Sequence, residues 1–98
     1  MNPEIAARLA GCHIQVLSDT KEHYLFAREN CIALVERAAD GFGSIGSTGL
    51  MTESGLAYLV WRDNRAILVG KGRETLAEPA QVEAVHRFSE DLKSVLSG

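Results

Sequence analysis

The chain has 98 residues, of which 46% are hydrophobic and 23% are charged, and its formal net charge at pH 7 is −3. We expect a single globular domain over residues 1–98, because disordered chains are poorer in apolar residues and chains divide into domains only at greater length. Ten Lys and Arg residues against thirteen Asp and Glu residues give no surplus of positive charge, so neither nucleic acid nor a membrane surface is an expected partner.

The first four residues, Met1–Glu4, lack the basic and apolar parts of a signal peptide. The longest apolar run, Leu56–Trp61, is much too short to cross a membrane. Cys12 and Cys31 have neither the paired spacing of a metal or redox motif nor the number needed for a disulfide framework. These features predict a cytoplasmic protein in which both thiols are reduced and packed.

Residues 2–11 predict a short helix. Asn2 is a good N-cap, Pro3 suits the first helical position, and Gly11 suits a left-handed residue just past the end. Residues 12–18 follow, and they alternate well enough between apolar and polar to predict a half-buried strand.

Residues 22–39 fit two structures. A capping box before them and Gly41 after them would support a helix, but a helix would place Phe26 and Ala33 on its polar side. A hairpin would pair residues 23–28 with 31–36 and would place Tyr, Phe, Ile and Val in strands, which they favour. The hairpin, which we favour slightly, predicts these cross-strand pairs: His23 with Glu36, Leu25 with Leu34, and Phe26 with Ala33.

Four of the nine glycines lie in residues 41–49. The spacing of Gly41, Gly43 and Gly46 matches the dinucleotide-binding fingerprint, and residues 41–48 resemble a phosphate-binding loop with Ser47 in place of the lysine. Both motifs need a helix directly after the glycines, and the residues that follow are poor helix formers. We therefore expect these glycines to form turns and a bulge, or to let another part of the chain approach closely, with a turn as the first expectation. If the chain binds a small ligand or an anion, the candidate residues are Gly43, Ser44, Gly46, Ser47, Thr48 and Lys71.

Residues 56–62 and 65–69 flank Asp63-Asn64, which tolerates the positive φ of a tight turn, and so predict a hairpin. A two-residue turn sets these pairs: Arg62 with Arg65, Trp61 with Ala66, Val60 with Ile67, and Leu59 with Leu68. Both faces of the hairpin are apolar, so it should lie centrally in its sheet and be covered twice. We expect Trp61 in the core, although an exposed tryptophan would mark an interface. Residues 45–51 predict a partner strand.

Gly70-Lys71-Gly72 is expected to end the sheet, and residues 73–78 to link it to a helix that begins at Pro79 and reaches about Leu96. The apolar stripe of this helix is Val82, Val85, Phe88, Leu92, Val95 and Leu96, and Asp91 is expected to face away from it. One helix covers one sheet face, and the short N-terminal helix is too small to cover the other. Either curvature of the sheet or a second copy of the chain is expected to bury the remaining face, and of the two we favour the second copy, as a homodimer.

The predicted fold is α+β, with an antiparallel meander sheet of about five to six strands, a short N-terminal helix and a long C-terminal helix on one face. No catalytic residue, metal or cofactor is predicted, because His13, His23 and His86 lack metal-ligand spacing and no serine has a recognisable base. The amino-acid sequence does not determine the biochemical function of the protein. It favours a protein-interaction or assembly domain that binds itself, as a homodimer, or another protein. The alternatives are a regulatory domain that binds a small ligand or anion through Gly41–Gly49 and, least supported, an enzyme.

Overall fold

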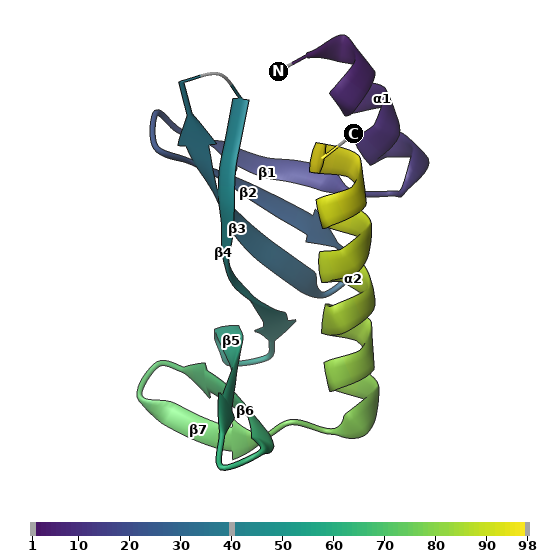
Figure 1. Cartoon of the computed structure of the whole chain (residues 1–98). Helices are drawn as coiled ribbons and strands as arrows, with labels where there is room; N and C mark the ends of the chain where they lie inside the picture. Colours follow the sequence, from purple (N-terminus) through teal and green to yellow (C-terminus); the bar gives the residue numbers. More distant parts are fainter. Residues whose placement is uncertain (1, 40, 98) are drawn as a thin grey trace.

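A computed structural model describes residues 2–39 and 41–97, which form two helices and seven strands. In chain order the elements are α1 (Pro3–Gly11), β1 (Gln15–Asp19), β2 (His23–Arg28), β3 (Cys31–Ala38), β4 (Gly41–Thr52), β5 (Gly55–Arg62), β6 (Arg65–Gly70), β7 (Arg73–Leu76) and α2 (Pro79–Ser97). The strands form one sheet in the order of the chain, and every neighbouring pair is antiparallel (Figure 1). The predicted α+β meander is confirmed, with seven strands instead of five or six.

The start of α1 agrees with its sequence, and its end does not. The Asn2 side chain accepts a hydrogen bond from the Glu4 N–H at 2.7 Å, as an N-cap does. Gly11 lies within the helix, however, and the left-handed residue after it is His13, at φ 60°. The prediction for Gly11 was therefore wrong by two residues. The strand that follows begins at Gln15, later than the sequence indicates.

Residues 23–38 form the β2–β3 hairpin, in the predicted register. His23 lies opposite Glu36, Leu25 opposite Leu34 and Phe26 opposite Ala33. Phe26 and Ala33 are both fully buried, although a helix would have put them on its polar side. Burial of these two side chains therefore decides between the two structures that local propensity left open.

The β5–β6 hairpin turns at Asp63-Asn64, where both residues have positive φ, and all four predicted cross-strand pairs are present. As predicted, neither strand of this hairpin is an edge strand, since β5 pairs with β4 and β6 pairs with β7. Lys71 and Gly72 also have positive φ, at 48° and 75°, and form a second tight turn instead of ending the sheet. Residues 73–76, expected as part of a link, are therefore the edge strand β7.

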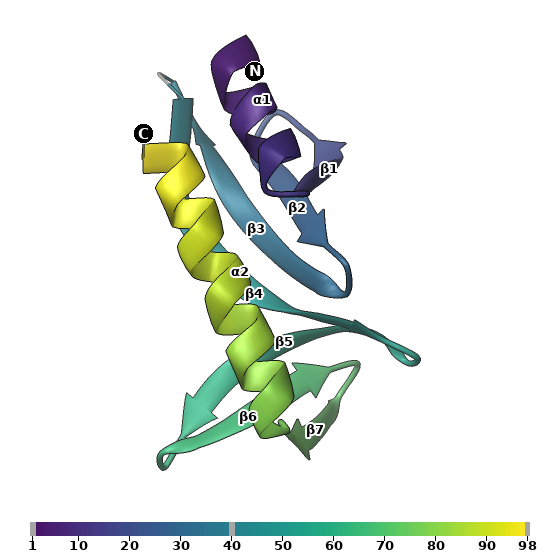
Figure 2. The same cartoon turned by 90° about the vertical axis from the view of Figure 1, so that its right-hand side faces the viewer.

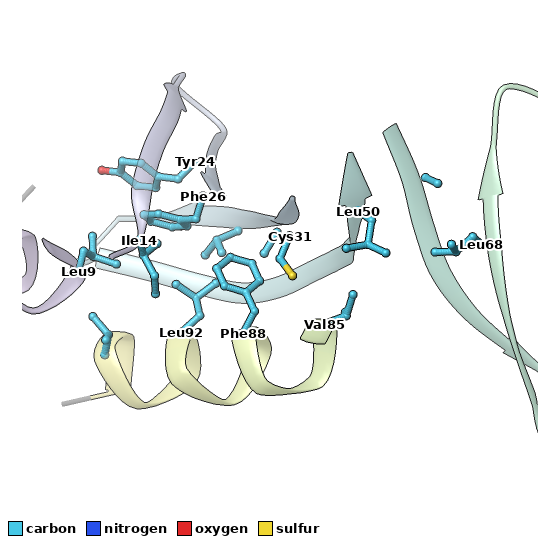
Figure 3. Close-up of a cluster of buried hydrophobic side chains, with 14 residues drawn as sticks. Leu9, Ile14, Tyr24, Phe26, Cys31, Leu50, Leu68, Val85, Phe88 and Leu92 are labelled. Atoms are coloured by element: carbon cyan, nitrogen blue, oxygen red, sulfur yellow. The ribbon is translucent and has the colours of Figure 1, made fainter. Parts of the chain in front are cut away.

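Helix α2 lies along one face of the sheet, here called the inner face, and crosses β3 and β4 (Figures 1 and 2). Phe88 and Leu92 are fully buried and Val85 nearly so, and these side chains point from α2 toward Phe26, Ile14, Cys31 and Leu50 (Figure 3). Leu9 of α1 belongs to the same buried cluster. The predicted packing of the long helix on one face is confirmed.

Asp91 does not simply face away from the sheet, as the helix pattern suggests. Its carboxylate oxygen lies 2.8 Å from the Arg28 guanidinium, which is also centred 5.5 Å from the middle of the Phe88 ring. Arg28 therefore joins the β2–β3 hairpin to α2 through an ion pair and a cation–π contact. The stripe pattern missed this because it assigns a residue to a face by hydropathy alone.

The opposite face of the sheet, here called the outer face, has no helix over it among the described residues, since both helices contribute to the inner cluster. Cross-strand pairing aligns apolar side chains along this face. Those that are half-buried are Leu25, Leu34, Leu56, Tyr58, Val60, Ile67 and Val69. Leu76 of β7, which lies opposite Ile67, is 66% exposed. A single copy therefore leaves an apolar face partly in solvent.

Substitution of Phe88 tests the dependence of the fold on α2. We expect Phe88→Ala to lower the free energy of unfolding by about 3–5 kcal/mol and Phe88→Leu by about 1–2 kcal/mol, because a fully buried ring leaves a cavity. His86→Ala, on the exposed side of the same helix, should change it by less than about 0.5 kcal/mol. Urea unfolding measures all three, and equal losses for Phe88→Leu and His86→Ala would contradict the packing described.

Candidate functional site

The glycine-rich stretch forms most of β4, so the expectation of a turn was wrong, whereas the expected bulge, close approach and strand over 45–51 are confirmed. Residues from Gly41 onward pair with β3, beginning with Gly41 opposite Ala38 and continuing to Leu50 opposite Cys31. The strand continues without interruption to Thr52. No helix N-terminus follows the glycines, and the backbone arrangement that holds a dinucleotide or a phosphate is accordingly not formed here.

Strand β4 contains two β-bulges. Three cross-strand pairs show this: Phe42 with Arg37, Ile45 with Val35, and Thr48 with Ala33. From one pair to the next, β4 advances by three residues and β3 by two. One extra residue of β4 is therefore accommodated in each interval, in Gly43-Ser44 and again in Gly46-Ser47. We call these pairs the two Gly-Ser bulges; all four of their residues are exposed.

The glycines of the bulges lie close to β3. A Cβ atom at Gly43 would lie 3.1 Å from the Glu36 Cβ, and one at Gly46 would lie 3.3 Å from the Leu34 carbonyl oxygen. Glu36 and Leu34 are the β3 residues that the two bulges oppose. The signal that could have identified this strand is the repeat Phe-Gly-Ser, Ile-Gly-Ser, whose period of three reflects two residues opposed to one.

Gly49 is required by a close approach between strands. A Cβ atom there would lie 2.0 Å from the Ala57 carbonyl oxygen and 2.7 Å from the Tyr58 Cα. Gly49 is buried and lies directly opposite Tyr58, where β4 and β5 first pair. Its lack of a side chain is therefore explained by packing of the sheet, with no ligand needed.

The candidate ligand residues lie in two separate places. Gly43, Ser44, Gly46, Ser47 and Thr48 are contiguous on β4. Lys71 lies in the β6–β7 turn, and a Cβ atom at Gly55 would lie 3.0 Å from its Cε atom. Because Gly55 pairs with Thr52 at the other end of β4, the lysine lies away from the two bulges. The structure brings the β4 residues together and does not bring Lys71 to them.

A hollow of about 310 Å³ lies between β5–β7 and the start of α2. Its polar lining includes Arg73, Glu78 and the Thr75 hydroxyl, and Gln81 accepts a hydrogen bond from the Glu78 N–H at 2.8 Å. The sequence did not indicate this hollow, because residues 73–78 were expected to be a link without structure. Glu78 offsets the charge of Arg73, so the lining does not concentrate positive charge for an anion.

Cys31 is buried on the inner face, beside Phe88 (Figure 3). Burial raises the pKa of its thiol above the ordinary value of 9.0, and the nearby Arg28 charge only partly opposes this effect. A buried thiol that stays protonated is a poor nucleophile. Cys31 is therefore a packing residue, which agrees with the sequence-based expectation of a packed thiol.

Other kinds of site find little support in residues 2–39 and 41–97. No group of three or more His, Cys, Asp or Glu side chains is placed to hold a metal ion. The histidines lie on three different segments: His13 after α1, His23 in β2 and His86 in α2. In the same residues, neither helix is long and apolar enough to cross a membrane.

Gly49→Ala tests whether β4 and β5 approach as closely as described. We expect a loss of about 1–3 kcal/mol in the free energy of unfolding, or failure to fold, because the added methyl group would overlap the β5 backbone. Ser47→Ala, at an exposed position of the same strand, should change it by less than about 0.5 kcal/mol. Urea unfolding compares the two, and a Gly49→Ala protein as stable as Ser47→Ala would contradict the geometry.

The pKa of Cys31 predicts how the domain responds to high pH. Because the folded pKa is raised, the unfolded state loses its proton first, and the free energy of unfolding should decline as the pH rises above about 9.0. Cys31→Ala should remove this part of the pH dependence. Urea unfolding from pH 7 to 10 measures it, with Cys12→Ala as the control; equal slopes for both variants would contradict the assignment.

Comparison with protein-family models, with curated proteins and with solved structures gave no match to this chain. Two surfaces stand out in its structure: the apolar outer face and the glycine-rich strand β4 with its two Gly-Ser bulges.

Proposed function

We propose that this protein is an interaction domain that acts as a homodimer and whose outer sheet face binds another protein. The observation that carries this proposal is the amount of apolar surface that the two helices leave uncovered. Large contiguous apolar surfaces on soluble domains mark sites of protein interaction.

Two rows of paired side chains make the outer face continuous over β5–β7. One row crosses β5, β6 and β7 and consists of Val60, Ile67 and Leu76. The next row consists of Tyr58 and Val69, and Leu56 lies beyond Tyr58 on the same side of β5. Arg62 and Glu74 form an ion pair at the rim of this patch. An apolar centre with a charged rim is the usual composition of a protein-binding surface, and it suits a partner that presents apolar side chains.

Trp61 supports a role in protein interaction without belonging to the outer face, because strand alternation places it on the same side as Leu59 and Leu68 of the inner cluster. The sequence predicts it in the core, but its side chain is 63% exposed at the end of β5, so that prediction was wrong. The reason is that α2 covers β3 and β4 and does not extend over the tip of the β5–β6 hairpin. Tryptophan is among the residues that contribute most to binding at interfaces, and this one is the chain's single tryptophan.

The homodimer is a separate part of the proposal from the outer face, which is assigned to another protein. A second copy is the partner that is always present at equal concentration, and two-fold pairs are the commonest assembly of soluble proteins.

The alternative functions have less support. A ligand-binding or anion-binding domain using Gly41–Gly49 would have to act without Lys71, which lies elsewhere. An enzyme would need a nucleophile with a base beside it, and the buried Cys31 thiol is held protonated by its surroundings.

Sedimentation equilibrium over a hundred-fold range of concentration tests the homodimer. We expect the mass to approach twice 10.6 kDa as concentration rises, because mass action favours the dimer at higher concentration. A mass of one chain at every concentration would contradict the proposal.

A further inference from the structure

Part of strand β4 has an open edge. β5 pairs with β4 only from Gly49 to Thr52, whereas β4 begins at Gly41. The preceding residues, Gly41–Thr48, have β3 on one side and no strand among the described residues on the other. β5 in turn continues beyond Tyr58 paired with β6 alone, and Figure 2 shows β4 and β5 diverging from the turn that joins them. This stretch therefore presents backbone N–H and C=O groups to solvent.

This edge lacks the features that usually protect an exposed edge from other strands. Between Gly41 and Thr52 the chain has no charged residue and no proline. The two outer strands differ, because β1 ends with Asp19 and β7 contains Arg73 and Glu74. Charged side chains discourage strand addition, whereas glycine and serine allow another backbone to come close.

The two Gly-Ser bulges determine which strand would fit this edge. β4 uses eight residues, Gly41–Thr48, along the length in which β3 uses six, Ala33–Ala38. A regular strand beside β4 would have its hydrogen-bonding groups out of step at both bulges. A suitable partner must itself be irregular at two places with the same separation.

A second copy of β4 meets this requirement. The bulges lie symmetrically about Ile45, since Gly43-Ser44 precedes it and Gly46-Ser47 follows it. In an antiparallel pair centred on Ile45, the first bulge of each copy would lie opposite the second bulge of the other. The irregular spacing of the two strands then coincides, which favours self-pairing over addition of a regular peptide.

We propose that the open edge of β4, Gly41–Thr48, pairs with the same edge of a second copy, antiparallel and centred on Ile45. This inference rests on the proposed homodimer and names its contact. The pair joins two sheets edge to edge and leaves both outer faces free for another protein.

Charges introduced along the edge, of one sign or of opposite signs in the two copies, test the inference. Ser44 and Ser47 are exposed, so Ser44→Glu/Ser47→Glu and Ser44→Lys/Ser47→Lys should each fold. We expect each double variant alone to dimerise on the order of ten-fold or more weakly than the unmodified chain, because like charges of the two copies are brought close together on either side of the two-fold axis. An equimolar mixture of the two variants should restore the dimer mass.

Two matched variants serve as controls. Ser18→Glu/Ser94→Glu makes the same charge change at exposed positions of β1 and α2, and Val60→Lys/Ile67→Lys alters the outer face. Both should keep the dissociation constant of the unmodified chain, and circular dichroism confirms folding of every variant. Hydrogen exchange of residues 41–48 should also slow as concentration rises.

The possible failures are distinguishable. An unmodified chain that stays a monomer would overturn both the homodimer and the edge. A dimer that survives Ser44→Glu/Ser47→Glu but is lost in Val60→Lys/Ile67→Lys would overturn the edge alone, because the outer face would then be the contact. A mixture of the Glu and Lys variants that fails to dimerise would also count against pairing through β4.

Discussion

Packing of the α2 stripe against the inner face is the interaction on which the rest of the molecule depends. Phe88 and Leu92 lose all contact with water, and their burial is the largest apolar contribution that any helix of this small domain makes. The β2–β3 hairpin supplies the opposing surface through Phe26 and Ala33. Since α1 is only nine residues long, it too depends on this cluster for its position.

The elements that the sequence predicts correctly are those whose signals are local. Two-residue turns set the register of the β5–β6 hairpin, and helical periodicity predicts α2 to within one residue of its end. β4 could not be predicted in full, because its two bulges replace the strand period of two by three. The prediction also missed β7. The turn before it is Lys71-Gly72, and lysine is not among the residues that usually begin a two-residue hairpin turn.

The candidate site was less accessible from sequence than the fold. The atoms that each glycine contacts depend on the register and close approach of paired strands, as where Gly49 meets Ala57 and Tyr58. The separation of Lys71 from the bulges likewise follows from the register of β4 with β5. Exposure of Trp61 depends on how far α2 extends over the sheet, and hydropathy carries no information about that reach.

The order of the strands has a consequence for how the chain folds. Every strand pairs with its neighbours in sequence, so each pairing closes only a short loop, and the sheet can grow hairpin by hairpin at little entropic cost. The Arg28–Asp91 ion pair, by contrast, joins residues 63 positions apart. Docking of α2 is therefore the step with the largest loop to close, and the speed of folding should depend mainly on it.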